Sequence, residues 1–247
     1  MAERVAVVMA AGKGTRMKSD LPKVLVPVVG RPMIHYVLDA LTAAGVSRMV
    51  VVVGYRAELV RDELAGRAGV EFADQTEQLG TGHAVMMCRE ALVGHDGPVC
   101  VVAGDSPMMR ADSLAALLDE FDRSTPACLL GTADKDDPTG LGRVVRDAAG
   151  NFAAIVEEKD ASDEQRRITE VNLSCYVFNN RDLFFALDRL TTDNVQREYY
   201  ITDCPAILLE SGRSVQALKV LKPTEALSIN TMEELAIVEQ AMRGKAG

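Results

Sequence analysis

The sequence predicts an α/β protein, in which a Rossmann-like, mixed and mostly parallel sheet is flanked by helices and carries a smaller β-rich lobe. In the first half, short continuous apolar runs such as Val5–Met9 and residues 49–53 alternate with helix-like segments. This alternation is typical of parallel strands that are buried on both faces. In the second half, strand-like runs at 142–146, 152–157 and 171–178 follow one another less regularly. The first pattern predicts βα units and the second predicts the additional lobe.

Each expected element has a local reason in the sequence. The helix at 33–44 stops at Gly45, because glycine commonly terminates helices. The hairpin between 142–146 and 152–157 turns at Asp147-Ala-Ala-Gly150. The last helix follows Thr231-Met-Glu-Glu234, which has the spacing of a capping box. The other elements expected in the first half are strands at 70–72, 99–103 and 127–131 and helices at 56–65, 81–92 and 113–121.

The length fits one large α/β domain or two small ones, and we expect a single domain spanning residues 1–247. The net charge of −9 makes a nucleic-acid partner a poor hypothesis, since such partners require a basic face. No apolar run approaches the roughly 20 residues of a membrane-spanning helix. The N-terminus lacks the pattern of a signal peptide, so we expect a cytoplasmic protein without a membrane partner. The oligomeric state stays open.

Several kinds of catalytic site are not supported. The five cysteines include no C-x-x-C pair, and no G-x-S-x-G sequence occurs. Positive charge nevertheless gathers near the N-terminus, where basic residues outnumber Glu3 and Asp20. The basic residues are Arg4, Lys13, Arg16, Lys18, Lys23 and Arg31. A small anionic ligand fits this local charge better than a polymer does.

The loop after the first strand reads Ala10-Ala-Gly-Lys-Gly-Thr-Arg-Met17. Its paired glycines can present backbone N–H groups to phosphate oxygens. It is not a Walker loop, because Lys13 is followed by Gly14, and it is not a dinucleotide fingerprint, because Met17 replaces the third glycine. Prolines continue the loop past Asp20, and Arg16 and Lys23 are fixed cations for a triphosphate. The alternative is a flexible basic surface loop.

This loop, followed by Leu-Pro-Lys23, resembles the signature of the sugar-phosphate nucleotidyltransferases. Within that group the chain resembles the uridyltransferase half of the bacterial bifunctional N-acetylglucosamine-1-phosphate uridyltransferase/glucosamine-1-phosphate acetyltransferases. The resemblance runs from about Val5 to Asn230. Further matching stretches are Glu77-Gln-Leu-Gly-Thr-Gly-His83, Asp137-Pro-Thr-Gly140, Ile155-Val-Glu-Glu-Lys-Asp-Ala161 and Glu198-Tyr-Tyr-Ile-Thr-Asp203.

The resemblance implies roles for particular residues. Arg16 and Lys23 are the implied catalytic cations. Nucleotide contacts are implied for Ala10, Ala11, Gly12, Gly14 and Thr15 in the loop and for Gln75, Gln78, Gly80 and Thr81 near the uracil and ribose. A glutamine amide suits the edge of uracil, although a solvated polar turn explains these glutamines about equally well.

The resemblance also implies a metal pair and a sugar pocket. Asp105 and Asn230 are the implied Mg²⁺ ligands, and each can otherwise be interpreted as a helix cap. Gly140, Glu157 and Asn172 are the implied contacts to N-acetylglucosamine. The implied arrangement is a nucleotide-binding half at 1–135, a sugar-binding half at 136–230 and a terminal helix at 231–247. No hexapeptide repeat of an acetyltransferase is present, so acetyl transfer is not expected.

The sequence departs from the family pattern at three places. Ala103 occupies a position where Tyr is frequent, Leu173-Ser174 replaces a small residue and Gly, and Arg197 replaces Gly.

The expected partners are UTP and N-acetylglucosamine 1-phosphate, which would give UDP-N-acetylglucosamine and pyrophosphate. Two alternatives remain. One is a nucleotidyltransferase for another sugar phosphate, for another nucleoside triphosphate, or for CTP and a polyol phosphate, and the other is a nucleotide-sugar sensor without catalysis.

Overall fold

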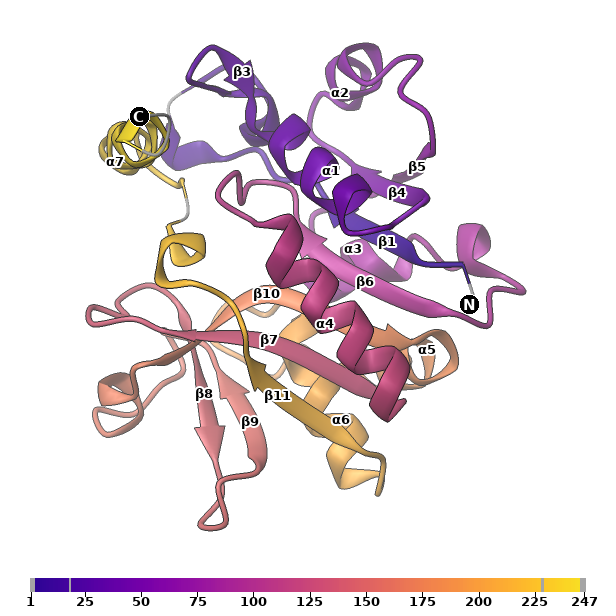
Figure 1. The fold of residues 1–247 in the computed structure, drawn as a ribbon, viewed down its shortest axis with the longest axis vertical. Helices are drawn as coiled ribbons and strands as arrows, with labels where there is room; N and C mark the ends of the chain where they lie inside the picture. The colour runs from indigo at the N-terminus through magenta and orange to yellow at the C-terminus, as the bar shows by residue number, and fades with distance from the viewer. Residues whose placement is uncertain (1–2, 18, 228, 245–247) are drawn as a thin grey trace.

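The computed structural model describes residues 3–17, 19–227 and 229–244. The predicted domain 1–247 extends beyond this range at both ends, and Lys18 of the basic segment lies outside the described residues. Among the described residues, one sheet contains nine strands and a second, small sheet contains two. The large sheet has the order β11-β7-β10-β6-β1-β4-β5, and β8 and β9 extend from β10. Figure 1 shows this sheet running through both halves of the molecule.

The observed strands begin and end close to the predicted positions in the first half. The strands of the large sheet are β1 (Val5–Met9), β4 (Arg48–Val53), β5 (Val70–Asp74), β6 (Pro98–Ala103), β7 (Cys128–Asp134), β8 (Gly142–Arg146), β9 (Phe152–Val156), β10 (Glu170–Asn179) and β11 (Val215–Lys219). The small sheet pairs β2 (Pro27–Val28) with β3 (Arg31–Pro32). Strands β1, β4, β5 and β6 run parallel to one another, whereas β10 is antiparallel to β6, β7 and β8. The predicted mixed and mostly parallel α/β fold is confirmed.

Helices cover both faces of the large sheet. They are α1 (Met33–Ala43), α2 (Ala57–Glu63), α3 (Thr81–Met86), α4 (Ala111–Ser124), α5 (Asn180–Leu187), α6 (Cys204–Glu210) and α7 (Met232–Gly244). Successive β1 residues point to opposite faces of the sheet. Ala6 and Val8 belong to the core that is covered by α1, α2 and α4. Val5 and Val7 belong to the core that is covered by α3, α5 and α6. This strict alternation is why the strand is a continuous apolar run.

Several elements differ from prediction in length or were not predicted. The helix predicted over 81–92 is two shorter pieces, α3 and a 3₁₀ turn at Glu90–Leu92. Helices α5 and α6 and strand β11 were not predicted. The capping box before α7 is confirmed, since Glu234 N donates to Thr231 Oγ1 at 3.2 Å and the Glu234 carboxylate accepts from Thr231 N at 3.1 Å.

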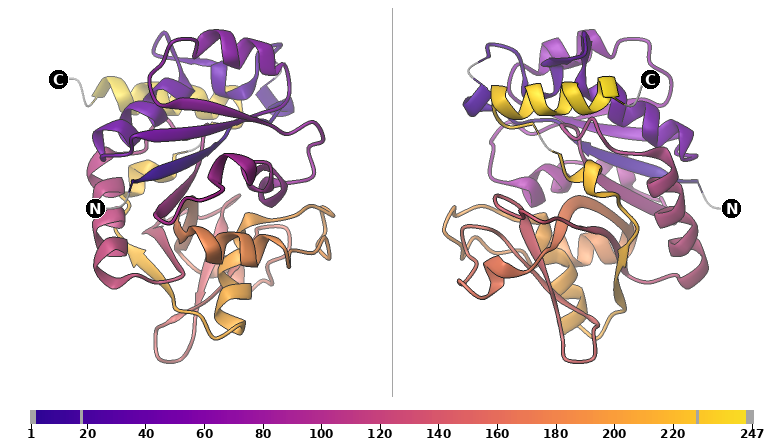
Figure 2. Two further views of the ribbon diagram at one scale, coloured as in Figure 1. Left: turned by 90° about the vertical axis from the view of Figure 1, so that its right-hand side faces the viewer. Right: turned by 60° about the vertical axis from the view of Figure 1, so that its left-hand side comes forward.

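Helix α7 packs on the N-terminal part of the chain. It contacts β2 and shares a small apolar core with Val28 and Met33 through Leu235 and Val238. Figure 2 shows α7, in yellow, lying along the indigo N-terminal elements. The last helix therefore carries Asn230, which precedes it, back to the phosphate loop. No helix in the described part of the chain has the length and apolarity required to cross a membrane.

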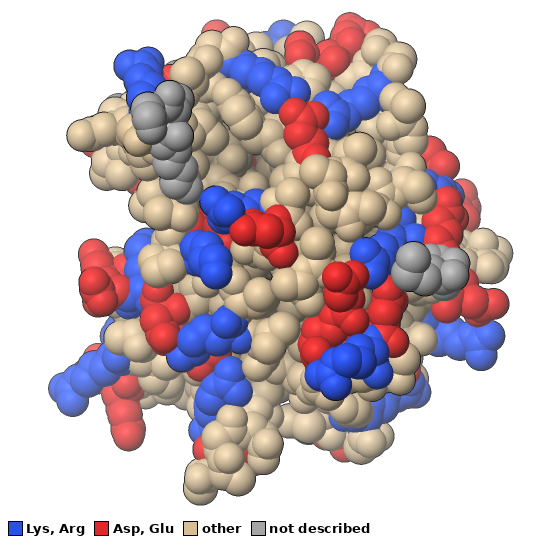
Figure 3. Space-filling model, in the orientation of Figure 1, with Lys and Arg blue, Asp and Glu red and all other residues tan. Residues whose placement is uncertain are grey.

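The surface carries charges of both signs. On the face shown in Figure 3, basic and acidic side chains are interspersed. Many charged side chains of the described residues form exposed ion pairs, as Arg61 does with Asp74 and Arg181 with Asp96. Such pairs contribute little to stability because water and salt screen them.

Candidate active site

The predicted site residues follow the carboxyl ends of neighbouring strands. Met9 at the end of β1 lies opposite Val52 of β4 and Ala103 of β6, and Val53 lies opposite Asp74 of β5. The loops that leave these strands therefore meet at one edge of the sheet, where ligands of open α/β sheets bind. The sheet brings together the phosphate loop, the loop that begins at Gln75 and the segment that contains Asp105.

A cavity of about 380 Å³ lies over this edge. Seven of the nine residues predicted to bind nucleotide line it, together with Lys23 and Asp105. The seven are Ala10, Ala11, Gly12, Gln75, Gln78, Gly80 and Thr81. Gly14 and Thr15 do not line it. Gly14 has a left-handed backbone (φ 64°), and a Cβ there would lie 2.7 Å from Lys23 Cβ. Because Gly14 has no side chain, the side chain of Lys23 can pack directly against the loop at this point.

The predicted cations and the predicted metal ligands form one polar cluster. The Lys23 ammonium makes a short contact with the Asp105 carboxylate and donates to Asn230 Oδ1 at 2.8 Å. Arg16 Nη2 also donates to Asn230 Oδ1, at 3.0 Å. These four residues come from three distant parts of the chain. Helix α7 and strand β6 are what bring Asn230 and Asp105 to the loop.

The oxygen donors of this cluster fit a hard divalent cation. Asp105 and Asn230 present a carboxylate and an amide oxygen to the same ammonium group, and Mg²⁺ binds oxygen ligands of this kind. Within the described ranges, no group of three or more acidic, histidine or cysteine side chains is arranged to hold a metal. A metal bound here would therefore complete its coordination with water and substrate phosphate oxygens, which is the usual situation for Mg²⁺.

A second cavity, of about 250 Å³, adjoins the first. It contains the predicted residues Arg16, Asp105, Asn230, Gly140 and Asn172. Its remaining lining comes from Ala103, Ser106, Lys135, Thr139, Leu141, Leu173, Ser174, Glu225, Ala226 and Glu234. Asp105 lines both cavities. The predicted nucleotide and sugar residues are thus in adjacent spaces that meet at the predicted metal ligand.

Asn172 is held in a fixed orientation at a bulge in β10. Its Nδ2 donates to the Tyr176 hydroxyl at 2.7 Å, and its Oδ1 accepts from Ser174 N at 3.3 Å. The pairing of β10 with β7 shifts register between Asn172 and Tyr176, and Ser174 has a left-handed backbone (φ 51°). Glycine adopts this conformation without steric cost, which accounts for the expected Gly at this position.

Glu157 lies beside the second cavity but does not line it. A Cβ on Gly142 would be 3.6 Å from both carboxylate oxygens of Glu157. Burial raises the pKa of Glu157, and the nearby charges of Asp203 and Asp160 raise it further. Burial of Asp203 and the nearby charge of Asp160 likewise raise the pKa of Asp203. Glu157 and Asp203 are therefore neighbouring carboxyls whose acidity is weakened.

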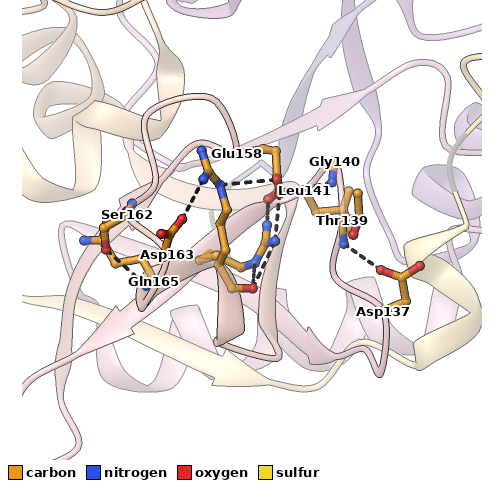
Figure 4. A network of polar contacts seen from close by, with 10 residues as sticks. Asp137, Thr139, Gly140, Leu141, Glu158, Ser162, Asp163 and Gln165 are labelled. Atoms are coloured by element: carbon orange, nitrogen blue, oxygen red, sulfur yellow. Dashed lines mark hydrogen bonds and ion pairs between the residues drawn. The ribbon is translucent and has the colours of Figure 1, made fainter.

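The loop containing Gly140 is tied to the charged segment after β9. Glu158 Oε2 accepts from Gly140 N at 3.2 Å and from Arg143 Nη2 at 2.7 Å, and Asp137 Oδ1 accepts from Thr139 N at 3.1 Å (Figure 4). Arg143 is only 1% exposed and also donates to the carbonyl of Leu141. A buried guanidinium with these partners fixes the loop that carries Gly140.

Gln75 and Gln78 contact protein groups as well as lining the first cavity. Gln75 is 3% exposed and its Nε2 donates to Gly80 O at 3.0 Å, while Gln78 Nε2 donates to Gln75 O at 3.0 Å. Gly80 has φ 110°, and a Cβ there would lie 2.5 Å from Tyr199 O. Gly82 N donates to that same carbonyl at 2.7 Å. The segment around Gly80 is thereby joined to the Glu198-Tyr-Tyr stretch.

Sequence reasoning missed several residues of the two cavities. Glu198 lines the first cavity, Lys135 and Thr139 line the second, and Ser174 lines both. Glu198 and Thr139 lie within stretches that match the family, and Ser174 stands at a departure from the family pattern, but none of them had been assigned a role. Lys135 had no local signal, because its place in the cavity depends on how β7 and β10 pair.

The chain matches the model of the MobA-like NTP transferase domain over residues 6–200. The chain belongs to this family. It is 47% identical over 241 residues to the bifunctional protein GlmU of an Exiguobacterium species and 43% identical over 243 residues to that of Listeria monocytogenes. Each alignment covers 98% of this chain and 53% of the relative, so the chain spans about half the length of the curated relatives it matches. The resemblance and the nucleotidyltransferase class expected from the motifs are confirmed.

Solved structures agree on the fold. A UDP-glucose pyrophosphorylase in complex with UDP-glucose superposes with a TM-score of 0.78 at 18% identity, covering 99% of this chain and 100% of that one. A putative glucose-1-phosphate thymidylyltransferase from Bacillus anthracis, in complex with sucrose, gives 0.80 at 16% identity and covers 97% of this chain and 95% of that one. At these identities the similarity concerns the fold alone.

Proposed function

We propose that this chain transfers UMP from UTP to N-acetylglucosamine 1-phosphate in a Mg²⁺-dependent reaction, giving UDP-N-acetylglucosamine and pyrophosphate. The observation that carries the proposal is that Asp105 lines both cavities and contacts Lys23, which also binds Asn230. A triphosphate in the first cavity and a sugar phosphate in the second would meet at this carboxylate. The expected cytoplasmic location remains a prediction.

The proposed reaction is an in-line displacement at phosphorus. An oxygen of the sugar phosphate forms a bond to the α-phosphorus of UTP, and the bond from that phosphorus to the pyrophosphate oxygen breaks. The attacking phosphate is already ionised, so no general base is required. Alignment of the two substrates and neutralisation of their charges therefore supply the rate enhancement.

The residues of the cluster have distinct proposed roles. Lys23 and Arg16 donate to phosphate oxygens once the substrates replace their present partners, Asp105 and Asn230. Asp105 and Asn230 would hold Mg²⁺, which when bound supplies positive charge to the phosphate oxygens. Because Lys23 now contacts both proposed metal ligands, its ammonium must move toward the phosphates when a metal binds.

Base and sugar selection are assigned to the two cavities. Gln75, Gln78, Gly80 and Thr81 are proposed to bind the uracil and ribose, and Gly140, Glu157 and Asn172 are proposed to bind the amino sugar. The 1–135 half would thus bind nucleotide and the 136–230 half would bind sugar. Asn172, held by Tyr176 and Ser174, supports this assignment because its amide is already oriented at the cavity wall.

A substrate panel tests the proposal. UTP, dTTP, CTP and GTP are each incubated with several sugar 1-phosphates and Mg²⁺, and pyrophosphate release is measured. We expect the highest kcat/KM for UTP with N-acetylglucosamine 1-phosphate. A higher value for another pair would overturn the assigned substrates. Tight binding of UDP-N-acetylglucosamine without turnover of any pair would favour a nucleotide-sugar sensor.

A further inference from the structure

Lys135 is a cation of the second cavity that the proposed mechanism does not use. It follows the end of β7, and its backbone N donates to Thr169 O at 3.0 Å. The residue is half-buried and lines the cavity together with Gly140 and Asn172. Across the described part of the chain, its ammonium makes no hydrogen bond and no ion pair. A half-buried ammonium that makes no hydrogen bond and no ion pair is a place where an anion gains affinity.

The other charged groups of the cavity already have protein partners. Glu225 accepts from Arg110 N, Ser113 Oγ and Lys222 N at 2.7–2.9 Å. Glu234 accepts from the backbone N–H groups at the start of α7. Arg16 donates to Asn230.

Glu225 and Glu234 are therefore engaged with other groups, and neither forms an ion pair with Lys135 in the described part of the chain. Asp137 feels the charge of Lys135, which helps the hydrogen bonds from Thr139 to hold the pKa of Asp137 below its usual value. Asp137 does not line the second cavity.

We infer that Lys135 binds the 1-phosphate group of the acceptor sugar and so helps to select a phosphorylated sugar. The assignment rests on the proposed function. It follows from placement: Asp105 and Asn230 mark the proposed metal end of the cavity, Gly140 and Asn172 mark the proposed sugar end, and Lys135 lines the same space. A lysine is a compact point charge on a flexible stem, which suits a phosphate that must also reach the α-phosphorus.

The test separates acceptor binding from nucleotide binding. Lys135→Gln is expected to raise the KM for N-acetylglucosamine 1-phosphate by roughly 10- to 100-fold, as for loss of one charge-assisted hydrogen bond. The KM for UTP is expected to change by less than about twofold, because Lys135 does not line the first cavity. Lys135→Arg should recover most of the acceptor affinity, since it restores the positive charge.

Lys219→Gln is the matched control. It removes the same charge from an exposed residue of β11 that pairs with Asp134, outside both cavities, and both KM values should stay at the wild-type level. If Lys135→Gln does not fold, Lys135→Met keeps most of the aliphatic stem and takes its place. An active wild type whose Lys135 variants keep their acceptor KM overturns this assignment alone. A wild type that releases no pyrophosphate with any sugar 1-phosphate overturns the proposed function and this assignment with it.

Discussion

The ammonium of Lys23 lies between the two oxygen donors that we propose as metal ligands. It contacts Asp105 and Asn230, and Arg16 shares Asn230. At the scale of single residues, the sequence could name all four as candidates, because each matches a position of the family that the chain resembles. It could not indicate that they contact one another, since Asn230 is more than 200 positions from Lys23.

Replacement of Asp105 tests the proposed metal site. Asp105→Asn removes one negative charge where a cation is expected, so kcat should fall by on the order of 10²-fold or more. Pyrophosphate release at saturating Mg²⁺ measures the effect. Asp96→Asn is the control, since Asp96 is exposed and only pairs with Arg181 at 3.0 Å. Normal kcat in the Asp105 variant would remove this residue from its role.

Glu157 predicts a pH dependence of stability. Burial raises its pKa, so the folded protein binds this proton more tightly than the unfolded chain does. The group therefore lowers the free energy of unfolding as pH rises from the unfolded pKa to the folded pKa. Glu157→Gln does not lose this part of the free energy of unfolding. The variant should therefore be more stable than the wild type at about pH 8, and the difference should be smaller at about pH 5.

Urea unfolding of the wild type and Glu157→Gln at both pH values gives the difference. Glu164→Gln is the matched control, because Glu164 is exposed. A stability difference for Glu157→Gln that does not change with pH would contradict the assignment of the burial effect to this carboxyl.

At the scale of elements, the segment at Gly80 joins the first half of the chain to the second. Gly82 N donates to Tyr199 O, and Tyr199 N donates to Leu79 O at 2.8 Å. The ring of His83 stacks on that of Tyr199, with the centroids 6.4 Å apart. The sequence indicated the glycine and the Glu198-Tyr-Tyr motif separately, but the contact between them is tertiary.

Gly80→Ala tests this joint. The new Cβ would lie 2.5 Å from Tyr199 O on a backbone with φ 110°, so we expect a loss of more than about 2 kcal/mol in the free energy of unfolding. Gly94→Ala is the matched control, because Gly94 also has positive φ (77°) but no atom lies within 4 Å of its added Cβ. It should cost about 1 kcal/mol. Equal losses in the two variants would show that the contact with Tyr199 adds nothing.

At the scale of the whole molecule, the large sheet continues through both predicted halves. Strand β10 from the second half pairs with β6 from the first over Cys175–Asn179 and Pro98–Val102. The core on the α3, α5 and α6 side contains residues of both halves. The boundary at 135 therefore crosses a shared sheet and a shared core, which favours cooperative folding.

Urea unfolding should accordingly show one transition. The chain has five tyrosines and no tryptophan, so tyrosine fluorescence and far-UV circular dichroism are suitable probes. Their midpoints should coincide, because both halves lose the shared sheet together. Two separated midpoints would indicate that residues 1–135 and 136–230 unfold independently.

The sequence by itself determined the strands of the first half, the phosphate loop, the candidate cations and metal ligands, and the family resemblance. These depend on local patterns: apolar runs for buried strands, glycines for a tight loop and a capping box before α7. The tertiary structure decided that α7 returns to β2, that Asp105 lines both cavities and that Lys135 reaches the second one. Such contacts join residues far apart in the chain, and no local pattern encodes them, because pairing and packing of distant elements set their distances.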